Sequence, residues 1–338
     1  MGADGSGERL LFLVNMLDGV PVTSDVLGTS WEVANAPSPC TVFLPRPPDD
    51  YDGMWDLARP PVKAAEAALE WFETRLRDDW DWWGRGSEGN SVRREVTVAV
   101  VQWAAVVTAP HPSADQRDQI AHADRITEAV ERWLSMVGAW LEVLAELVLA
   151  PAGMRTPDRS RPRYVYPLPL LVDEDGRLRS HPAITQVVAG SSADRGANRH
   201  HWDRAVAHAN AARLPPEEHV LLRDGRAAWW RQDRRKAVID AATAAEVAMA
   251  TAVRERLAST ADEPASDQVL RNVRGAVELL DLATALGCSF PVSRGSVMNE
   301  LAVRRNEAVH AGVEPTIDET RRALDVARAV VHAVSVLP

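Results

Sequence analysis

Residues 293–312 read SRGSVMNELAVRRNEAVHAG, and the spacing of their apolar side chains predicts a helix that ends just before Gly312. At 100° per residue, one stripe of this helix is apolar. Its members are Met298, Leu301, Ala302, Ala308 and Val309. Arg305 falls inside the stripe, whereas Arg304 falls on the polar side. We therefore expect Arg304 to be a solvated surface charge and Arg305 to point into the protein.

An inward-pointing arginine needs a partner, because its guanidinium stays charged at any pH that a protein tolerates. The helix predicted over Asp233–Leu257 offers Glu246, which falls at the centre of an otherwise apolar stripe. Two opposite charges on the apolar faces of two helices predict an ion pair between Arg305 and Glu246. In this interpretation Glu246 is a packing partner of Arg305 and takes no part in chemistry.

Four helical segments account for the last hundred residues. They are Asp233–Leu257, Asp267–Leu286, Ser293–Ala311 and Asp318–Leu337. Thr316 and Glu319 have the spacing of a capping box, which marks the start of the fourth helix. Short polar connections separate the segments, so we expect residues 233–338 to form a four-helix bundle.

The rest of the chain is expected to be mostly helical with a few short strands. Residues 1–160 form the N-terminal domain in this prediction, with short strands among residues 9–45 and a linker at Pro151–Pro162. Residues 161–232 are a connecting segment. Helical periodicity is present over Val62–Trp80, Val92–Val107, Gln119–Leu149, Trp202–Ala212 and Glu217–Arg231. The whole chain is thus predicted to be mainly α.

The composition narrows the possible partners. The 338 residues carry a net charge of −10, so a general attraction to nucleic acid is excluded and RNA binding requires a local basic patch. Residues 233–338 alone hold 13 Lys or Arg against 15 Asp or Glu. With two cysteines and no apolar run long enough to span a membrane, we expect a reduced, cytoplasmic protein without a membrane partner.

Three other features have less specific interpretations. Four histidines, His200, His201, His208 and His219, lack metal-ligand spacing and are predicted to be ordinary surface or loop residues. The glycines of the stretch GRGSEG at residues 84–89 have no βαβ context, which favours a flexible loop over a dinucleotide site. The acidic and tryptophan-rich run at residues 78–83 favours core packing or contact with a protein partner.

The motif RNEAVH, from Arg305 to His310, resembles the mark of the HEPN domain, R-x4-6-H. HEPN domains are four-helix bundles found in higher eukaryotes and prokaryotes. The resemblance extends to the flanking segments AVIDAATAAEVAM and PTIDETRRALDVARAVV and to the glycine after the motif. It covers Arg234 to Leu337, the C-terminal third of the chain.

This resemblance implies a metal-independent endoribonuclease without a cofactor, of the kind common in bacterial defence and stress-response systems. Arg305 would hold the scissile phosphate, and His310 would take or give a proton during attack by the 2′-hydroxyl. Asn306 would orient the phosphate or the imidazole, and the product would end in a 2′,3′-cyclic phosphate. The residues before the bundle would sense a signal, regulate the enzyme or bind a protein partner.

The spacing of the two residues places a condition on such a site. In an ideal α-helix Arg305 and His310 are about 140° apart and separated by about 7.5 Å along the axis. They converge only if the helix unwinds near Ala311 and Gly312 or if a second chain completes the site. The family resemblance implies the latter, a homodimer with two motifs facing one cleft.

Simpler interpretations stay open at this point. Arg305 would be a structural ion-pair residue, and His310 would only stabilise the C-terminus of its helix through the helix dipole. The domain as a whole would then be a non-catalytic HEPN-like module that dimerises or binds a nucleotide or a protein. The slight negative charge of the bundle favours this alternative.

Overall fold

Helices make up most of the residues that the computed structural model describes, which confirms the prediction of a mainly α chain. Those residues are 9–17, 22–37, 39–44, 46, 54–56, 85–88, 96–98, 101–109, 116–147, 164–165, 170–172, 178–180, 185–186, 196–258 and 262–338. The predicted helix Val62–Trp80, the run at 78–83 and the linker Pro151–Pro162 lie outside them. The chain divides into two compact units, Met1–Leu214 and Pro215–Pro338, which places the helix at Glu217 with the C-terminal bundle.

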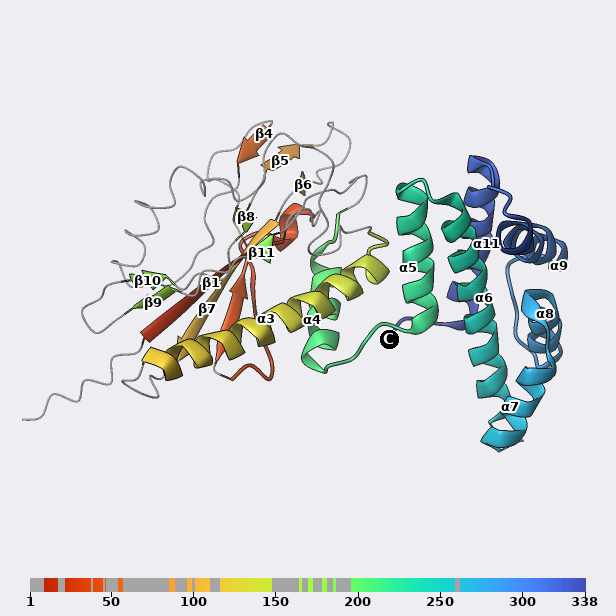
Figure 1. Cartoon of the computed structure of the whole chain (residues 1–338), viewed down its shortest axis with the longest axis horizontal. Coiled ribbons are helices and arrows are strands. Elements are labelled where there is room, and N and C mark those ends of the chain that lie inside the picture. The colour runs from red at the N-terminus through yellow and green to blue at the C-terminus, as the bar shows by residue number, and fades with distance from the viewer. Residues whose placement is uncertain are drawn as a thin grey trace, which may run out of the picture. The chain divides into compact units, whose positions relative to one another are not determined.

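A six-stranded antiparallel sheet forms the centre of the N-terminal unit (Figure 1). Its strands, in spatial order, are β10 (Leu178–Ser180), β9 (Leu170–Val172), β1 (Arg9–Leu17), β7 (Val101–Ala109), β3 (Cys40–Phe43) and β2 (Ser30–Glu32). β1 and β7 pair over their full nine-residue lengths. The N-terminal unit therefore holds more sheet than the few short strands predicted from the sequence.

Two smaller sheets and one short helix complete the strand-rich part of this unit. One sheet has the order β4 (Met54–Asp56), β5 (Arg85–Glu88), β6 (Val96–Val98), and the other pairs β8 (Tyr164–Val165) with β11 (Thr185–Gln186). A 3-10 helix, η1, spans Ser24–Val26.

The predicted helix over Val92–Val107 is wrong, because β6 and β7 lie there. Its many valines are β-branched and favour strands, and a nearly unbroken apolar run has no period that distinguishes helix from strand. The predicted loop at GRGSEG is likewise wrong at its centre, where β5 forms.

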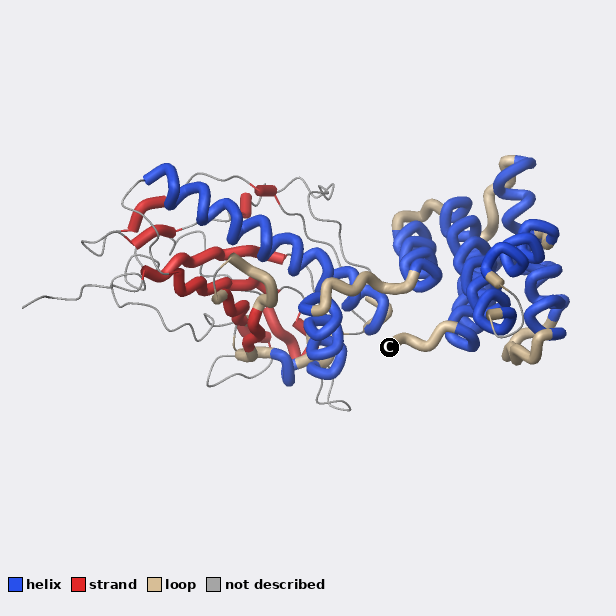
Figure 2. The backbone as a smooth tube through the Cα atoms, turned by 90° about the horizontal axis from the view of Figure 1, so that it is seen from below, coloured by secondary structure: helices blue, strands red, loops and turns tan. Residues whose placement is uncertain are grey.

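Two helices pack together in the N-terminal unit, α3 (Gln116–Leu144) and α4 (Arg199–Asn210), and α3 runs alongside the sheet (Figure 2). Trp133 of α3 donates a hydrogen bond from Nε1 to Asn210 Oδ1 over 2.7 Å. Asn210 in turn donates from Nδ2 to the carbonyl of Glu32, over 3.1 Å. His208 stacks on Trp140, with ring centroids 3.9 Å apart. The end of α4 thus connects α3 to the edge strand β2.

The C-terminal unit is a helical bundle. Its elements are α5 (Glu217–Trp230), α6 (Arg234–Leu257), α7 (Glu263–Asn272), α8 (Gly275–Ala285), α9 (Arg294–Ser296), η2 (Val297–Val303), α10 (Arg304–Asn306), η3 (Glu307–Ala311) and α11 (Ile317–Val334). The elements from α9 to η3 are consecutive turns of one helix, residues 294–311, called the motif helix below. The capping box at α11 is confirmed, since Thr316 and Glu319 bond each other's backbone N–H groups.

The helix predicted over Asp267–Leu286 is interrupted. α7 ends at Asn272, Val273 adopts an extended backbone, and α8 begins at Gly275 with a φ of +76°. A positive φ strains any residue with a Cβ atom, so glycine permits the break. The apolar periodicity continues on both sides of Gly275, which is why the sequence pattern did not predict it.

Small residues let the helices of the bundle approach closely. α6 buries alanines along its length, and α5 presents the buried Gly225 to it. A Cβ atom at Gly225 would lie 3.2 Å from the carbonyl oxygen of Ala237 and 3.2 Å from Leu324 Cδ2. Contacts this short require the neighbours to move, and a backbone carbonyl in a packed helix moves only at a cost.

Replacement of Gly225 by valine is therefore expected to lower the free energy of unfolding by roughly 1–3 kcal/mol through overpacking. Urea unfolding followed by circular dichroism measures this. Gly295→Ala is the matched control, because a Cβ atom there meets only Ser293 Oγ at 3.7 Å. The control should be neutral or slightly stabilising, as expected for a helical position. Equal stability of the valine variant and the wild type would contradict the close contact.

The start of α5 and the end of α11 are joined by buried polar groups. His219, 3% exposed, contacts the carbonyl oxygen of Ser335 through Nε2 at 3.0 Å, and Ser335 donates its hydroxyl to the buried Glu218. A carbonyl only accepts, so Nε2 carries the hydrogen. His208 is buried as well, so the prediction of ordinary surface or loop histidines is wrong for His208 and His219.

Acid is expected to destabilise the C-terminal unit through His219. Burial lowers the pKa of His219, with smaller lowering effects of His332 and Arg226, against raising effects of the Ser335 carbonyl and Glu218. The unfolded chain then binds a proton more readily than the folded one. The contribution of His219 to stability is present above the ordinary histidine pKa and is lost as the pH falls below it. In thermal melts, His219→Asn should lose less stability than wild type between pH 7.5 and pH 5. An equal loss in both proteins would contradict this assignment.

Candidate functional site

Arg304 holds the motif helix to α11. Its Nη1 donates to Glu307 Oε2 over 2.7 Å, and its Nη2 lies 3.1 Å from Glu319 Oε1. The hydrogen bond to Glu307 raises the pKa of the guanidinium above its ordinary value, with help from the charge of Glu319. The prediction of a solvated surface charge is therefore wrong, because only 28% of this side chain is exposed and two carboxylates hold it.

Arg305 is half-buried and has no such partner. Its Nε is shielded from solvent and makes no hydrogen bond, and no ion pair joins the side chain to any described residue. Among the described arginines of the C-terminal unit, Arg231, Arg271 and Arg274 also lack a side-chain partner, but all three are exposed. A buried N–H group without a hydrogen bond costs free energy, and an anion bound to the guanidinium would recover part of it.

The predicted ion pair between Arg305 and Glu246 is absent from the described residues. Arg235 of α6 meets the motif helix at Ala308, three residues from Arg305. Glu246 lies eleven residues further along α6, a distance of about 16 Å at 1.5 Å per residue. Glu246 instead lies beside the start of α8, where its Oε1 is 3.9 Å from the position of a Cβ atom on Gly275. The two charges share the bundle but lie at different levels along it.

The motif helix contains two π-helical segments, η2 before Arg305 and η3 after it. At the end of η3 the N–H of Gly312 donates to the carbonyl of Glu307, five residues back, and Val313 also donates to it, over 3.2 Å. Hydrogen bonds of this span widen the helix and bring residues five apart closer to one face. Because His310 lies in η3, the offset calculated for an ideal α-helix does not apply unchanged from Arg305 to His310.

His310 and Asn306 are both exposed, and neither side chain makes a hydrogen bond or ion pair within the described part of the chain. The helix ends directly after His310, at Gly312, which adopts the left-handed conformation with a φ of +65°. Glycine is the residue that adopts this conformation without strain. The imidazole is thus presented to solvent at a widened helix end.

The start of α6 fixes this helix end from the other side. Arg235 donates from Nη2 to the carbonyl oxygen of Ala308 over 2.8 Å, and Arg234 pairs with Glu314 just beyond the motif. Ala308 lies between Arg305 and His310 in the chain, so Arg235 brings a second guanidinium to the motif. Arg234 and Arg235 were not predicted from the sequence, because neither a backbone carbonyl acceptor nor an ion pair between residues eighty positions apart has a sequence pattern.

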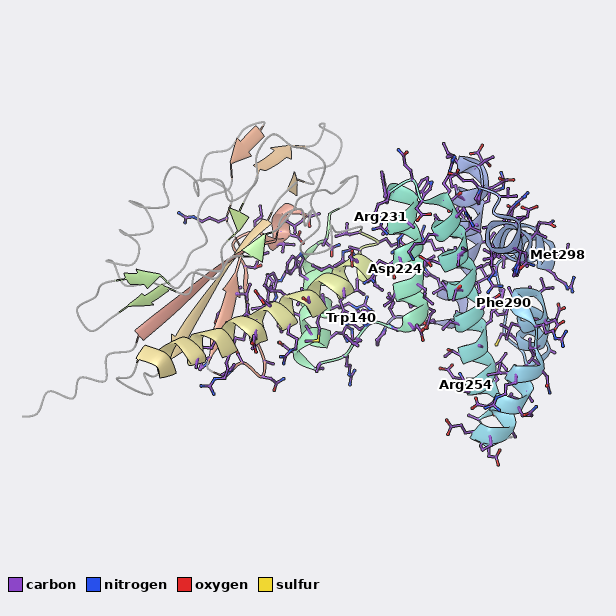
Figure 3. All side chains as sticks on the ribbon, in the orientation of Figure 1. Trp140, Asp224, Arg231, Arg254, Phe290 and Met298 are labelled. Carbon is purple, nitrogen blue, oxygen red and sulfur yellow. The ribbon has the colours of Figure 1, made fainter. Side chains whose placement is uncertain are left out.

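Five large apolar side chains that are exposed in the C-terminal unit lie between residues 298 and 317: Met298, Val303, Val309, Val313 and Ile317. Met298, labelled in Figure 3, is 41% exposed and Val309 is 43% exposed, although both were predicted to face inward. The buried members of the motif helix are Val297, Leu301 and Ala308. The π-turns change the angle per residue, so a wheel drawn at a constant 100° misplaces these side chains.

No protein-family model, curated protein or solved structure matches this chain. Within the described residues, no group of three or more His, Cys, Asp or Glu side chains has the arrangement of a metal site. None of the described helices has the length and apolarity needed to cross a bilayer.

Proposed function

We propose that the C-terminal unit is a metal-independent endoribonuclease of the HEPN type, with Arg305 and His310 as its catalytic residues. The observation that carries the proposal is Arg305, a half-buried arginine with a shielded Nε and no partner among the described residues, five residues before an exposed histidine. A phosphate diester would supply the missing anion. The resemblance of residues 234–337 to HEPN domains gives the same residues these roles.

The chemistry follows from the two side chains. The 2′-oxygen attacks the adjacent phosphorus, the bond from phosphorus to the 5′-oxygen breaks, and a 2′,3′-cyclic phosphate and a 5′-hydroxyl result. Arg305 donates N–H groups to the non-bridging oxygens as negative charge develops on them. His310 takes the proton of the 2′-hydroxyl or gives one to the 5′-oxygen, since imidazole titrates near neutral pH. Asn306 is an exposed amide beside Arg305 and would orient the phosphate.

One chain supplies one imidazole to this reaction. We propose that a homodimer brings two motifs to one cleft, so that the two copies of His310 share the roles of base and acid. The N-terminal unit is then the sensing or regulatory part, in a bacterial defence or stress-response system. Glu246 has no place in this site, because it lies about 16 Å along α6 from the point where Arg235 meets the motif helix.

A second candidate function is a non-catalytic HEPN-like module that binds a protein or a nucleotide. The observation in its favour is that five large apolar side chains within residues 298–317 are exposed: Met298, Val303, Val309, Val313 and Ile317. Docking sites for partners expose apolar side chains of this kind. In such a module Arg305 and His310 would contact the partner without chemistry.

Incubation of the purified full-length protein with total RNA in excess EDTA separates the two candidates. We expect cleavage that persists in EDTA and leaves 2′,3′-cyclic phosphate ends, detected by end-specific ligation and sequencing. Absence of cleavage under varied salt and pH would favour the binding module. Cleavage that EDTA abolishes would contradict the metal-independent mechanism.

A further inference from the structure

The C-terminal end of α5 exposes a tryptophan. Trp230 is 52% exposed, an unusual position for so large an apolar ring. Its neighbour Trp229 packs against the core of the bundle, and the two rings lie 5.8 Å apart between centroids at an angle of 50°. Trp229 thus anchors the end of α5, while Trp230 offers a rigid aromatic surface to the solvent.

The turn that follows Trp230 is basic. Residues 228–237, AWWRQDRRKA, are called the α5–α6 turn here and carry four basic residues against one acidic residue. Two of the basic residues have acidic partners, since Lys236 pairs with Asp240 and Arg234 pairs with Glu314. Arg231 has no partner among the described residues, and Arg235 donates only to a neutral carbonyl. Arg231, next to Trp230 in the chain, and Arg235, in the first turn of α6, are thus positive charges without an acidic partner among the described residues.

The α5–α6 turn lies next to the proposed catalytic motif. The hydrogen bond from Arg235 to the carbonyl of Ala308 and the ion pair of Arg234 with Glu314 bring η3 and the segment after it to the start of α6. Arg231 lies at the end of α5, at the end of the bundle where α11 begins (Figures 1 and 3). The aromatic ring, the two free charges and the motif thus belong to one end of the bundle.

Most acidic residues of this region have a cationic partner, so they do not oppose a polyanion strongly. Glu307 and Glu319 are held by Arg304, and Glu314 is held by Arg234, whereas Asp233 accepts the backbone N–H of Lys236 at the start of α6. The positive charges without an acidic partner among the described residues are Arg231, Arg235 and Arg305. A ligand that offers both phosphates and unpaired planar rings fits this combination.

We propose that the α5–α6 turn is a docking surface for single-stranded RNA, which leads the strand to Arg305 and His310. Trp230 stacks on an unpaired base, and Arg231 and Arg235 contact the backbone phosphates. RNA, and not another nucleic acid, is named because the inference rests on the proposed ribonuclease function. A duplex does not fit, since its bases are already stacked on one another.

Binding of a fluorescein-labelled oligoadenylate to the full chain, measured by anisotropy, tests this surface. The oligonucleotide carries 2′-O-methyl groups, so it cannot be cleaved by attack of a 2′-hydroxyl. Trp230→Ala is expected to weaken binding about tenfold, whereas Trp230→Phe keeps most of the affinity because phenylalanine also stacks. Arg231→Gln should reduce the slope of affinity against salt concentration. Arg271→Gln, at an exposed position on α7, is the matched control and should bind like wild type.

The outcomes separate this surface from the proposed enzyme. Equal binding by Trp230→Ala and wild type, or an equal loss for a duplex of the same length, would overturn the stacking surface. The absence of any RNA binding by the wild type would overturn it in favour of a protein partner. Binding that depends on Trp230, without cleavage of unmodified RNA by any variant, would support the surface and contradict the enzyme. Cleavage at full rate by Trp230→Ala at low RNA concentration would support the enzyme and contradict the surface.

Discussion

Replacing Arg305 by glutamine is expected to reduce RNA cleavage roughly 100- to 1000-fold, the usual effect of removing a donor that stabilises charge in a transition state. The free energy of unfolding should change by less than about 1 kcal/mol, because no described residue pairs with this guanidinium. Removal of the charge of an arginine in a buried ion pair would instead lower the free energy of unfolding by about 3–5 kcal/mol. Cleavage assays and urea unfolding on the same preparation give both quantities.

Arg304→Gln is the matched control, one residue away in the same helix. Arg304 bonds Glu307 and Glu319, so its loss should lower stability by up to about 1 kcal/mol and leave most of the cleavage activity. We therefore expect the neighbouring arginines to differ in activity, with a large loss for Arg305→Gln and a small one for Arg304→Gln, while both variants lose little stability. A large stability loss in Arg305→Gln with little change in activity would contradict the assignment.

His310→Ala is expected to lower the rate of RNA cleavage roughly 100- to 10,000-fold, the range for loss of a general acid or base. The melting temperature should change little, since the imidazole is exposed and makes no hydrogen bond or ion pair with the described residues. Cleavage rates under single-turnover conditions and thermal melts measure these effects.

The control for His310 is His200→Ala, which also removes an exposed imidazole but lies in α4 of the N-terminal unit. This variant should cleave like the wild type. Full activity of His310→Ala would contradict the proposed mechanism. His310 would then only stabilise the C-terminus of its helix.

The sequence predicted those parts of the fold where local signals and burial agree. α6 and the motif helix were placed within one residue at each end, because each has a helical period, and α11 was placed within one residue at its capped start and three residues at its end. The strand β7 and the break before Gly275 were not predicted. A valine run without a period fits both helix and strand, and a glycine reveals its φ only in the folded backbone.

The candidate site was predicted in its residues but not in its contacts. The helical wheel separated Arg305 from Arg304, but it is Arg304 that has carboxylate partners, whereas Arg305 has none among the described residues. A helical wheel gives the angle of each residue around the helix axis but not its position along the axis. The wheel therefore paired Arg305 with Glu246, which lies elsewhere along the bundle. It also assumes a uniform α-helix, which the π-helical segments η2 and η3 are not. Contacts to a backbone carbonyl, such as that of Arg235 with Ala308, have no sequence pattern at all.

The central claim is that Arg305 and His310 together cleave RNA without a metal. Its most direct test is single-turnover cleavage of RNA in excess EDTA by wild type, Arg305→Gln and His310→Ala, with analysis of the product ends. We predict 2′,3′-cyclic phosphate ends from the wild type and a loss of at least about 100-fold in each variant. Equal rates in all three proteins, or products without a cyclic phosphate, would contradict the claim.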